Sequence, residues 1–176
     1  MPNSRTTPAP CVELSPTLPA QEPVLANLFE LYAHDFSEFL DLKLGADGRF
    51  GCEWLSSYLK EPGRHAFIVR ADGHLAGFAF VSRGSEISGD AEVWDMAEFF
   101  VVRGFRRLGV GTRAAREVWK RFPGRWEVRV IEQNRKALEF WRNAVCEFLG
   151  ETVEPTPFSR DGRDWHVFSF ESGQAA

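Results

Sequence analysis

The chain has 176 residues, of which 44% are hydrophobic, and this is enough for one domain with a single core. Its formal net charge of −4 argues against a nucleic-acid binder, because such proteins show a broad basic face. The cysteines, Cys11, Cys52 and Cys146, are widely spaced and form no CxxC pair. We therefore expect neither a disulfide framework nor a metal site.

The chain shows no apolar leader after Met1 and no apolar run as long as a membrane span. We expect a cytoplasmic protein without membrane or nucleic-acid partners. Six of the ten prolines fall within the first 23 residues. Residues 1–10 are expected to form a flexible tail, and residues 11–172 a single domain.

The first half of the chain predicts helices followed by an antiparallel meander. Apolar residues at helical spacing predict a helix from Pro23 to Leu42, broken near His34-Asp35. The pair Asp72-Gly73 lies between two apolar runs, a pattern typical of a hairpin turn with positive φ at both positions. The remaining predictions are a first strand at 11–14, a short helix at 53–60, hairpin strands at 65–70 and 75–81, and a third strand at 91–102.

The second half predicts a βαβ unit and a C-terminal hairpin. A helix from Gly109 to Phe122 links the third strand to a strand at 126–131, which should run parallel to it through a right-handed crossover. Another helix starts at Asn134, and strands follow at 148–153 and 165–170. The expected fold class is α/β with a mixed sheet.

The stretch from Val101 to Thr112 joins a strand to a helix and combines glycines with arginines. A helix start has unpaired N–H groups and the positive end of the dipole, which suit a phosphate. Gly109 and Gly111 would let a ligand reach bare backbone. The flanking arginines, including Arg106 and Arg107, add donors that match phosphate oxygens. We infer that this turn binds the diphosphate of a nucleotide-bearing cofactor.

Residues 109–114 also fit the dinucleotide fingerprint GxGxxA, with Glu132 where a ribose-binding acid would stand. In that fold the first glycine follows the strand directly, whereas here residues 103–108 intervene. The glycines also follow a meander instead of opening a series of βαβ units. A nucleotide-dependent oxidoreductase is therefore the less favoured interpretation.

Two motifs together point to a family. Residues 106–111 match (Q/R)xxGx(G/A) after a strand that ends in Glu98-Phe99-Phe100-Val101-Val102, and residues 134–141 match NxxAxxF followed by an aromatic. With the strand order, the chain resembles the GNAT superfamily of acetyl-CoA-dependent N-acetyltransferases over roughly residues 11 to 170. The resemblance implies a GNAT-like acyltransferase fold and an enzyme that uses acetyl-CoA as co-substrate without a metal.

The resemblance also assigns the cofactor site. Backbone groups of the turn would bind the pyrophosphate, and the strand before it would bind the pantetheine arm through main-chain bonds. That strand and the next parallel one would splay apart, with a β-bulge near Phe100 that frees an N–H for the thioester carbonyl. Asn134 would bind through its side chain, unless it serves as a plain helix cap. The implied cofactor residues are Phe100, Val101, Val102, Arg106, Arg107, Leu108, Gly109, Val110, Gly111, Thr112, Asn134 and Trp141.

Acetyl transfer needs a neutral amine and therefore a base, for which Glu98 is the leading candidate. Strand alternation gives it a face with Trp94, Met96, Phe100 and Val102, where apolar surroundings would raise its pKa. A bulge could reverse this parity, and Asp95 would then be the alternative base. Pairing of Glu98 with a neighbouring arginine is the competing structural interpretation.

Trp141 stands where many members of the family place a tyrosine that protonates the leaving thiolate. An indole N–H is no usable acid, so Trp141 would at most contact the sulfur or line the tunnel. This departure keeps a non-catalytic acyl-CoA-binding sensor as an alternative function.

The acceptor is expected to be a small-molecule or peptide primary amine, attacked directly in a ternary complex. We expect an acidic, aromatic acceptor pocket that favours a cation, made of Asp35, Glu38, Trp54 and Trp94 with Asp95. The aromatic C-terminal hairpin is a candidate homodimer contact.

Overall fold

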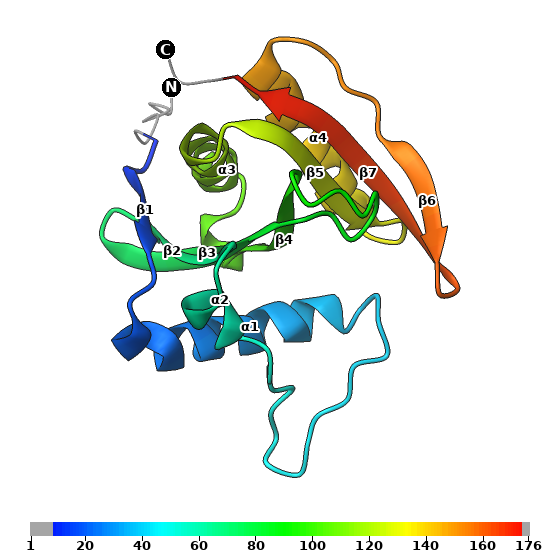
Figure 1. The fold of residues 1–176 in the computed structure, drawn as a ribbon. Coiled ribbons are helices and arrows are strands. Elements are labelled where there is room, and N and C mark those ends of the chain that lie inside the picture. The colour runs from blue at the N-terminus through cyan, green and yellow to red at the C-terminus, as the bar shows by residue number, and fades with distance from the viewer. Residues whose placement is uncertain (1–8, 174–176) are drawn as a thin grey trace, which may run out of the picture.

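A computed structural model describes residues 9–173, which form an α/β fold around one mixed sheet (Figure 1). The order of its seven strands is β1-β2-β3-β4-β5-β7-β6. All neighbouring strands are antiparallel except β4 and β5, which are parallel. The strands are β1 (Val12–Pro16), β2 (Arg64–Ala71), β3 (His74–Arg83), β4 (Trp94–Val101), β5 (Gly124–Ile131), β6 (Thr156–Arg160) and β7 (Arg163–Ser172).

The helices cover the two faces of this sheet (Figure 1). Helices α1 (Glu22–Phe36) and α2 (Ser57–Lys60) bury Leu25, Leu28 and Tyr58 on one face. Helices α3 (Val110–Arg121) and α4 (Arg135–Leu149) bury Val118, Trp119 and other apolar residues on the opposite face. Among residues 9–173, no helix is both long and apolar enough to cross a membrane.

The meander and the parallel crossover are confirmed. Asp72 and Gly73 have φ values of 49° and 78° in the turn between β2 and β3, as the hairpin prediction required. Of the apolar stripe predicted for residues 109–122, Val110, Ala114 and Val118 are buried in α3, which connects β4 to the parallel β5. Phe122 follows the end of the helix and is half-buried.

Several element bounds differ from the prediction. The first strand, predicted at 11–14, is β1, and the third strand begins at Trp94 instead of Ala91. Helix α1 ends at Phe36, well before Leu42, and residues 37–56 contain turns but no regular helix or strand. The helix predicted at 53–60 is reduced to the four residues of α2.

The strand predicted at 148–153 is wrong. Helix α4 continues to Leu149 because its apolar stripe extends through Ala144 and Val145, and Gly150, with a φ of 75°, ends it in the left-handed conformation. The strand that forms the C-terminal hairpin with β7 is β6, which starts at Thr156. Of the predicted tail, residues 1–8 lie outside the described residues, and the carbonyl of Pro10 accepts a hydrogen bond from Arg113.

Candidate active site

The turn between β4 and α3 presents backbone N–H groups at the protein surface. A short 3-10 helix, η2 (Arg103–Phe105), precedes it, and residues 106–109 are exposed. Arg107 has a φ of 62° and Gly109 a φ of 77°. Left-handed residues are typical of the backbone nests whose N–H groups bind an anion, and we interpret this turn as a candidate nest.

Helix α3 begins at this nest without a side-chain cap. Gly109 occupies the cap position, and no side chain accepts a hydrogen bond there. The first N–H groups of a helix have no partner within the helix and carry its positive dipole end. The residues present therefore fit the diphosphate of the cofactor that the sequence implied.

The two glycines of the motif have different surroundings. A Cβ on Gly109 would come no closer than 3.9 Å to the Arg113 side chain, so a ligand can approach it. A Cβ on Gly111 would lie 3.0 Å from Phe140 Cε2 of α4. Contrary to our expectation, the missing side chain of Gly111 serves the packing of α3 on α4 and not the approach of a ligand.

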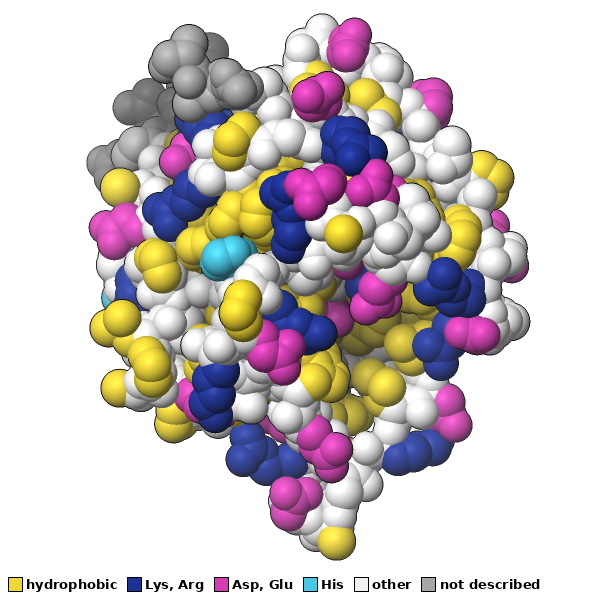
Figure 2. Space-filling view, in the orientation of Figure 1, with side chains coloured by type: hydrophobic (Ala, Val, Ile, Leu, Met, Phe, Trp, Pro, Cys, Tyr) yellow, Lys and Arg dark blue, Asp and Glu magenta, His cyan; other side chains and the backbone are white. Residues whose placement is uncertain are grey.

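Strands β4 and β5 separate over most of their length. They pair only through Trp94 with Trp126 and Asp95 with Glu127, so the edge of β4 after Asp95 has no β5 partner. This splay was expected. Figure 2 shows a hollow on the side of the molecule that faces the viewer. It lies between the α1 side and the β5–β7 side, and hydrophobic side chains are visible inside it.

Some of the main-chain groups expected to bind the cofactor arm already form hydrogen bonds within the protein. The Val101 carbonyl accepts a hydrogen bond from Arg106 Nε at 2.7 Å. Val102 donates its N–H to Ala76 at 2.8 Å and accepts from Phe105 at 2.9 Å. Val102 is therefore not free for the role we gave it, because the chain turns into η2 at this point.

A bulge in β4 reverses the side-chain parity. Phe80 pairs with Glu98 but Val81 pairs with Met96, so Ala97 is the extra residue, three residues before Phe100. Trp94 and Met96 consequently pack on the α3–α4 face, and Phe100 packs on the α1 face. Glu98 therefore does not share a face with Trp94 and Met96, and the bulge places Asp95 on the Glu98 side.

The Glu98 side chain points toward α1 and accepts a hydrogen bond from the Tyr32 hydroxyl through Oε2. Burial raises the pKa of Glu98 to about 7, although the Tyr32 hydrogen bond and the charge of Arg129 act in the opposite direction. Burial and the neighbouring Glu98 raise the pKa of Tyr32 well above its usual value. A carboxyl group that titrates near neutral pH is suited to proton transfer.

Asp95 lies deeper on the same face and is 3% exposed. Its Oδ2 is 3.1 Å from Arg129 Nη2, and Arg129 Nη1 is 2.6 Å from Glu86 Oε2. Burial raises the pKa of Asp95 to about 6 against the opposing charge of Arg129. Of the two candidate bases, Glu98 thus pairs with a tyrosine and Asp95 is in direct contact with an arginine.

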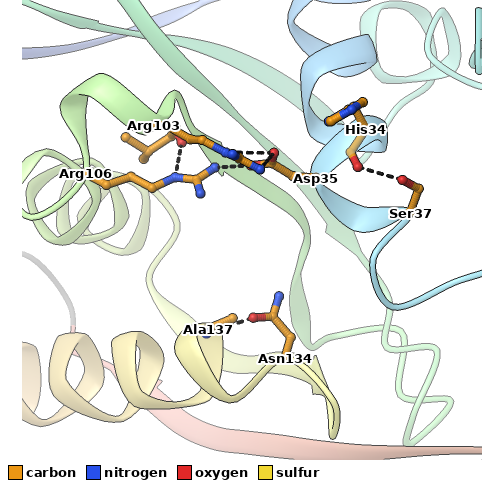
Figure 3. A network of polar contacts seen from close by, with 8 residues as sticks. His34, Asp35, Ser37, Arg103, Arg106, Asn134 and Ala137 are labelled. Atoms are coloured by element: carbon orange, nitrogen blue, oxygen red, sulfur yellow. Dashed lines mark hydrogen bonds and ion pairs between the residues drawn. The ribbon is translucent and has the colours of Figure 1, made fainter.

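Asp35 pairs with two arginines at the turn between β4 and α3, and this differs from the acceptor role that we expected. Its carboxylate oxygens pair with Arg103 Nη2 at 2.6 Å and with Arg106 Nη2 (Figure 3). Burial would raise the pKa of Asp35, but the hydrogen bonds from both arginines leave it below its ordinary value. The ion pairs of Asp35 connect α1 directly to the turn before α3.

The other predicted acceptor residues are not brought together. Trp94 packs against Phe122 and stacks on Trp126 on the α3–α4 face, because the bulge keeps it away from Glu98. Trp54 lies on the α1 face against Phe29, and it is 41% exposed. Glu38 is exposed on the segment after α1. The four residues therefore do not form the pocket that the sequence suggested.

Asn134 caps the start of α4, and Trp141 packs in the core from the same helix. Asn134 Oδ1 accepts the N–H of Ala137 at 3.0 Å as the helix cap, and its amide nitrogen points away from the helix (Figure 3). Trp141 is 6% exposed and packs against Phe99 and Trp119 in the core. Trp141 is thus a core residue, whereas the amide nitrogen of Asn134 is still available to a ligand.

Sequence reasoning missed two residues of the site. Tyr32 follows the helical stripe of α1, and no local signal connects it to Glu98. Arg129 could have been found, because strand alternation on β5 puts it on the face of Glu127, which pairs with Asp95.

Comparisons with known proteins agree with this geometry. Residues 25–145 match the model of the acetyltransferase (GNAT) family. The chain therefore belongs to the GNAT family of acetyltransferases. No curated protein matches the sequence significantly.

Solved structures with low sequence identity share the fold. An acetyltransferase from Thermus thermophilus is 19% identical with a TM-score of 0.64, over 91% of this chain and 96% of that one. Spermidine N-acetyltransferase from Vibrio cholerae, in complex with CoA and spermine, is 14% identical with a TM-score of 0.62, over 92% and 95%. NAA60 of Arabidopsis thaliana, in complex with acetyl-CoA, is 14% identical with a TM-score of 0.59, over 92% and 98%.

Proposed function

We propose that this chain transfers an acetyl group from acetyl-CoA to a primary amine by direct attack in a ternary complex, with Glu98 as the general base. The observation that carries the proposal is the Glu98 carboxylate, which lies beside the splayed strands with a pKa of about 7. Family membership supports the transfer reaction, and the position of Glu98 supports its role.

Acetyl-CoA supplies a thioester whose acetyl carbon accepts the amine. The N–H nest at residues 107–112 would bind the diphosphate, and the Asn134 amide nitrogen would donate to the cofactor. Arg103 and Arg106 lie at this turn and add positive charge near the diphosphate, while their guanidinium groups pair with Asp35.

Glu98 acts on the other reactant. An amine enters as an ammonium ion, and Glu98 takes one proton from it directly or through a water molecule. The nitrogen lone pair then forms the N–C bond, the C–S bond breaks, and the electron pair leaves on the sulfur of CoA. The nitrogen loses its second proton as the amide forms, and this proton passes through water to the CoA thiolate. The thiolate leaves without a dedicated acid, since Trp141 is packed in the core and cannot supply a proton.

The acceptor approaches from the α1 side in this scheme. The Glu98 carboxylate faces α1, and the aromatic side chains of Tyr32, Phe36 and Trp54 lie on that same face. Asp95 adds a second carboxyl group below Glu98. Acidic groups beside aromatic rings favour a cationic amine, either a small molecule or a peptide terminus.

The test is Glu98→Gln, with CoA release measured over a panel of amines. We expect the variant to lose about 10²–10⁴-fold in kcat, which is the usual contribution of a general base. Binding of acetyl-CoA, measured by calorimetry, should be unchanged. Asp95→Asn is the companion variant, because a larger loss there would make Asp95 the base.

A non-catalytic acyl-CoA sensor is the second candidate. Its support is Trp141 at the position where the family pattern has a tyrosine. A wild-type protein that binds acetyl-CoA and releases no CoA with any amine of the panel would favour the sensor and overturn the enzymatic proposal.

A further inference from the structure

Tyr32 is held in one place by its neighbours. Its ring centroid lies 5.4 Å from Phe29, 5.1 Å from Phe36, 5.8 Å from Phe78 and 6.0 Å from Phe100. These contacts involve α1 itself, β3 and β4, so the ring cannot turn without disturbing the core on this face. The Tyr32 hydroxyl therefore has a fixed position at the Glu98 carboxylate.

The two carboxylate oxygens of Glu98 differ. Oε2 accepts the Tyr32 hydroxyl, and among residues 9–173 this is the one hydrogen bond that the Glu98 side chain makes. Arg129 forms ion pairs with Asp95 and Glu86. Oε1 consequently has no hydrogen-bond partner among the described residues and keeps a free lone pair.

We propose that Tyr32 is a positioning residue for Glu98: its hydroxyl fixes the carboxylate through Oε2 and leaves Oε1 as the atom that takes the proton of the acceptor. This inference rests on the proposed role of Glu98 as the base. Tyr32 comes from α1, far from the NxxAxxF motif where the tyrosine of the family pattern would stand.

The hydroxyl acts as a hydrogen-bond donor and does not transfer its own proton. The pKa of Tyr32 is raised well above its usual value, so the hydroxyl keeps its proton through neutral pH. A donated hydrogen bond stabilises the ionised carboxylate more than the protonated one. Without this bond, the pKa of Glu98 would rise above its value of about 7.

Other groups around Glu98 also affect its titration. Arg129 on β5 lowers the pKa of Glu98, whereas Asp95 on β4 and Glu86 in the loop after β3 raise it. Cys52, on the segment after α1, and Tyr58 of α2 respond to the charge of Glu98 and have pKa values of about 12, so both remain neutral near pH 7. Tyr32 is the one group among these that touches the carboxylate through a hydrogen bond.

The test variant is Tyr32→Phe, which keeps the ring and removes the hydroxyl. In protein labelled with ¹³C at glutamate carboxyl groups, the Glu98 signal is assigned by its loss in Glu98→Gln. We expect the pKa of Glu98 to rise by about one unit in Tyr32→Phe. Tyr58→Phe, which removes the hydroxyl of a tyrosine that does not touch Glu98, should leave that pKa unchanged. An unchanged or lower pKa of Glu98 in Tyr32→Phe would overturn the inference.

The reciprocal measurement does not depend on the folding of Tyr32→Phe. The chain contains two tyrosines, so ¹³C-tyrosine spectra are simple to assign. Glu98→Gln should shift the Cζ signal of Tyr32 and leave that of Tyr58 in place. If neither tyrosine signal moves, the contact is absent in solution and the inference fails.

Kinetics separate this inference from the proposed function. In Tyr32→Phe the acid limb of kcat should move up with the pKa, so turnover falls about tenfold below pH 7 and less at pH 9. The KM for acetyl-CoA should stay within about twofold of its wild-type value. An equal loss at every pH would make Tyr32 merely structural and overturn the inference. Full turnover of Glu98→Gln would instead overturn the proposed base, even where the carboxyl titration shows that Tyr32 fixes Glu98.

Discussion

Asp35 near the end of α1 forms an ion pair with Arg103 in η2, with 2.6 Å between Oδ1 and Nη2, and its second oxygen binds Arg106. The single negative charge of this carboxylate offsets one of the two guanidinium charges at the turn that we assign to the cofactor diphosphate. Asp35→Asn should therefore tighten CoA binding about two- to tenfold, because both arginines become available to phosphate oxygens. Loss of the ion pair should lower the free energy of unfolding by no more than about 1 kcal/mol.

Calorimetric titration with CoA at two salt concentrations measures this effect. Glu117→Gln is the matched control, since it removes one negative charge from the Lys120 pair on α3 without touching the turn. Weaker binding of CoA by Asp35→Asn than by wild type would contradict the prediction and mean that Asp35 orients the arginines for the ligand.

Gly109 should be sensitive to substitution because of its backbone conformation. Its φ of 77° is one that side chains other than glycine rarely adopt, although the space around it is open. Gly109→Ala should lower the free energy of unfolding by about 1–2 kcal/mol and weaken acetyl-CoA binding. Gly104→Ala, in η2 where a Cβ would meet no atom within 4 Å, should stay within about 0.5 kcal/mol of wild type. Urea unfolding measures both, and equal losses would argue against a conformational cause.

The raised pKa of Glu98 makes stability depend on pH. The folded protein holds the Glu98 proton more tightly than the unfolded chain does, so this group stabilises the fold below about pH 4.5 and the effect is lost as pH rises to about 7. At pH 8 the ionised carboxylate costs up to about 3 kcal/mol. Glu98→Gln should therefore be more stable than wild type at pH 8, with a smaller difference at pH 5. Thermal unfolding at the two pH values checks this, and a Gln variant less stable than wild type at pH 8 would refute it.

Activity should follow the same titration. Because the ionised form of Glu98 accepts the proton, kcat should rise with pH through about 7 and then level off until the amine or another group titrates. A limb near pH 6 that disappears in Asp95→Asn would assign the base to Asp95 instead. A pH–rate profile of CoA release with wild type and the two carboxamide variants decides between them.

The parts of the fold with strong local signals were predictable. Asp72-Gly73 specifies a hairpin by itself, and the stripe of Val110, Ala114 and Val118 specifies one face of a helix. The end of α1 was harder to predict, because Phe39 and Leu40 continue the apolar pattern after the helix has ended. The strand predicted at 148–153 failed because Gly150 was not interpreted as a helix stop.

In the candidate site, too, the residues close together in the sequence were predictable and those that meet over long separations were not. The turn at residues 106–112 is contiguous, so its glycines and arginines could be recognised in the sequence. Glu98 depends on the bulge at Ala97, which no glycine or proline marks. Its partner Tyr32 is 66 residues away, and Asp35 is 68 residues from Arg103. Contacts over such separations are determined by packing, which the spacing of residue types alone does not encode.

The separation of β4 from β5 has a mechanical consequence. On the face of α3 and α4 one continuous core joins β2 and β3 to β5 and β7, but the strands themselves are joined across the middle of the sheet by only two residue pairs. A molecule seated along the free edge of β4 would take the place of a missing strand and brace the two halves. The co-substrate would then hold the two halves of the sheet together as well as react. The protein should become more rigid each time it binds its acyl donor and more flexible each time it releases CoA.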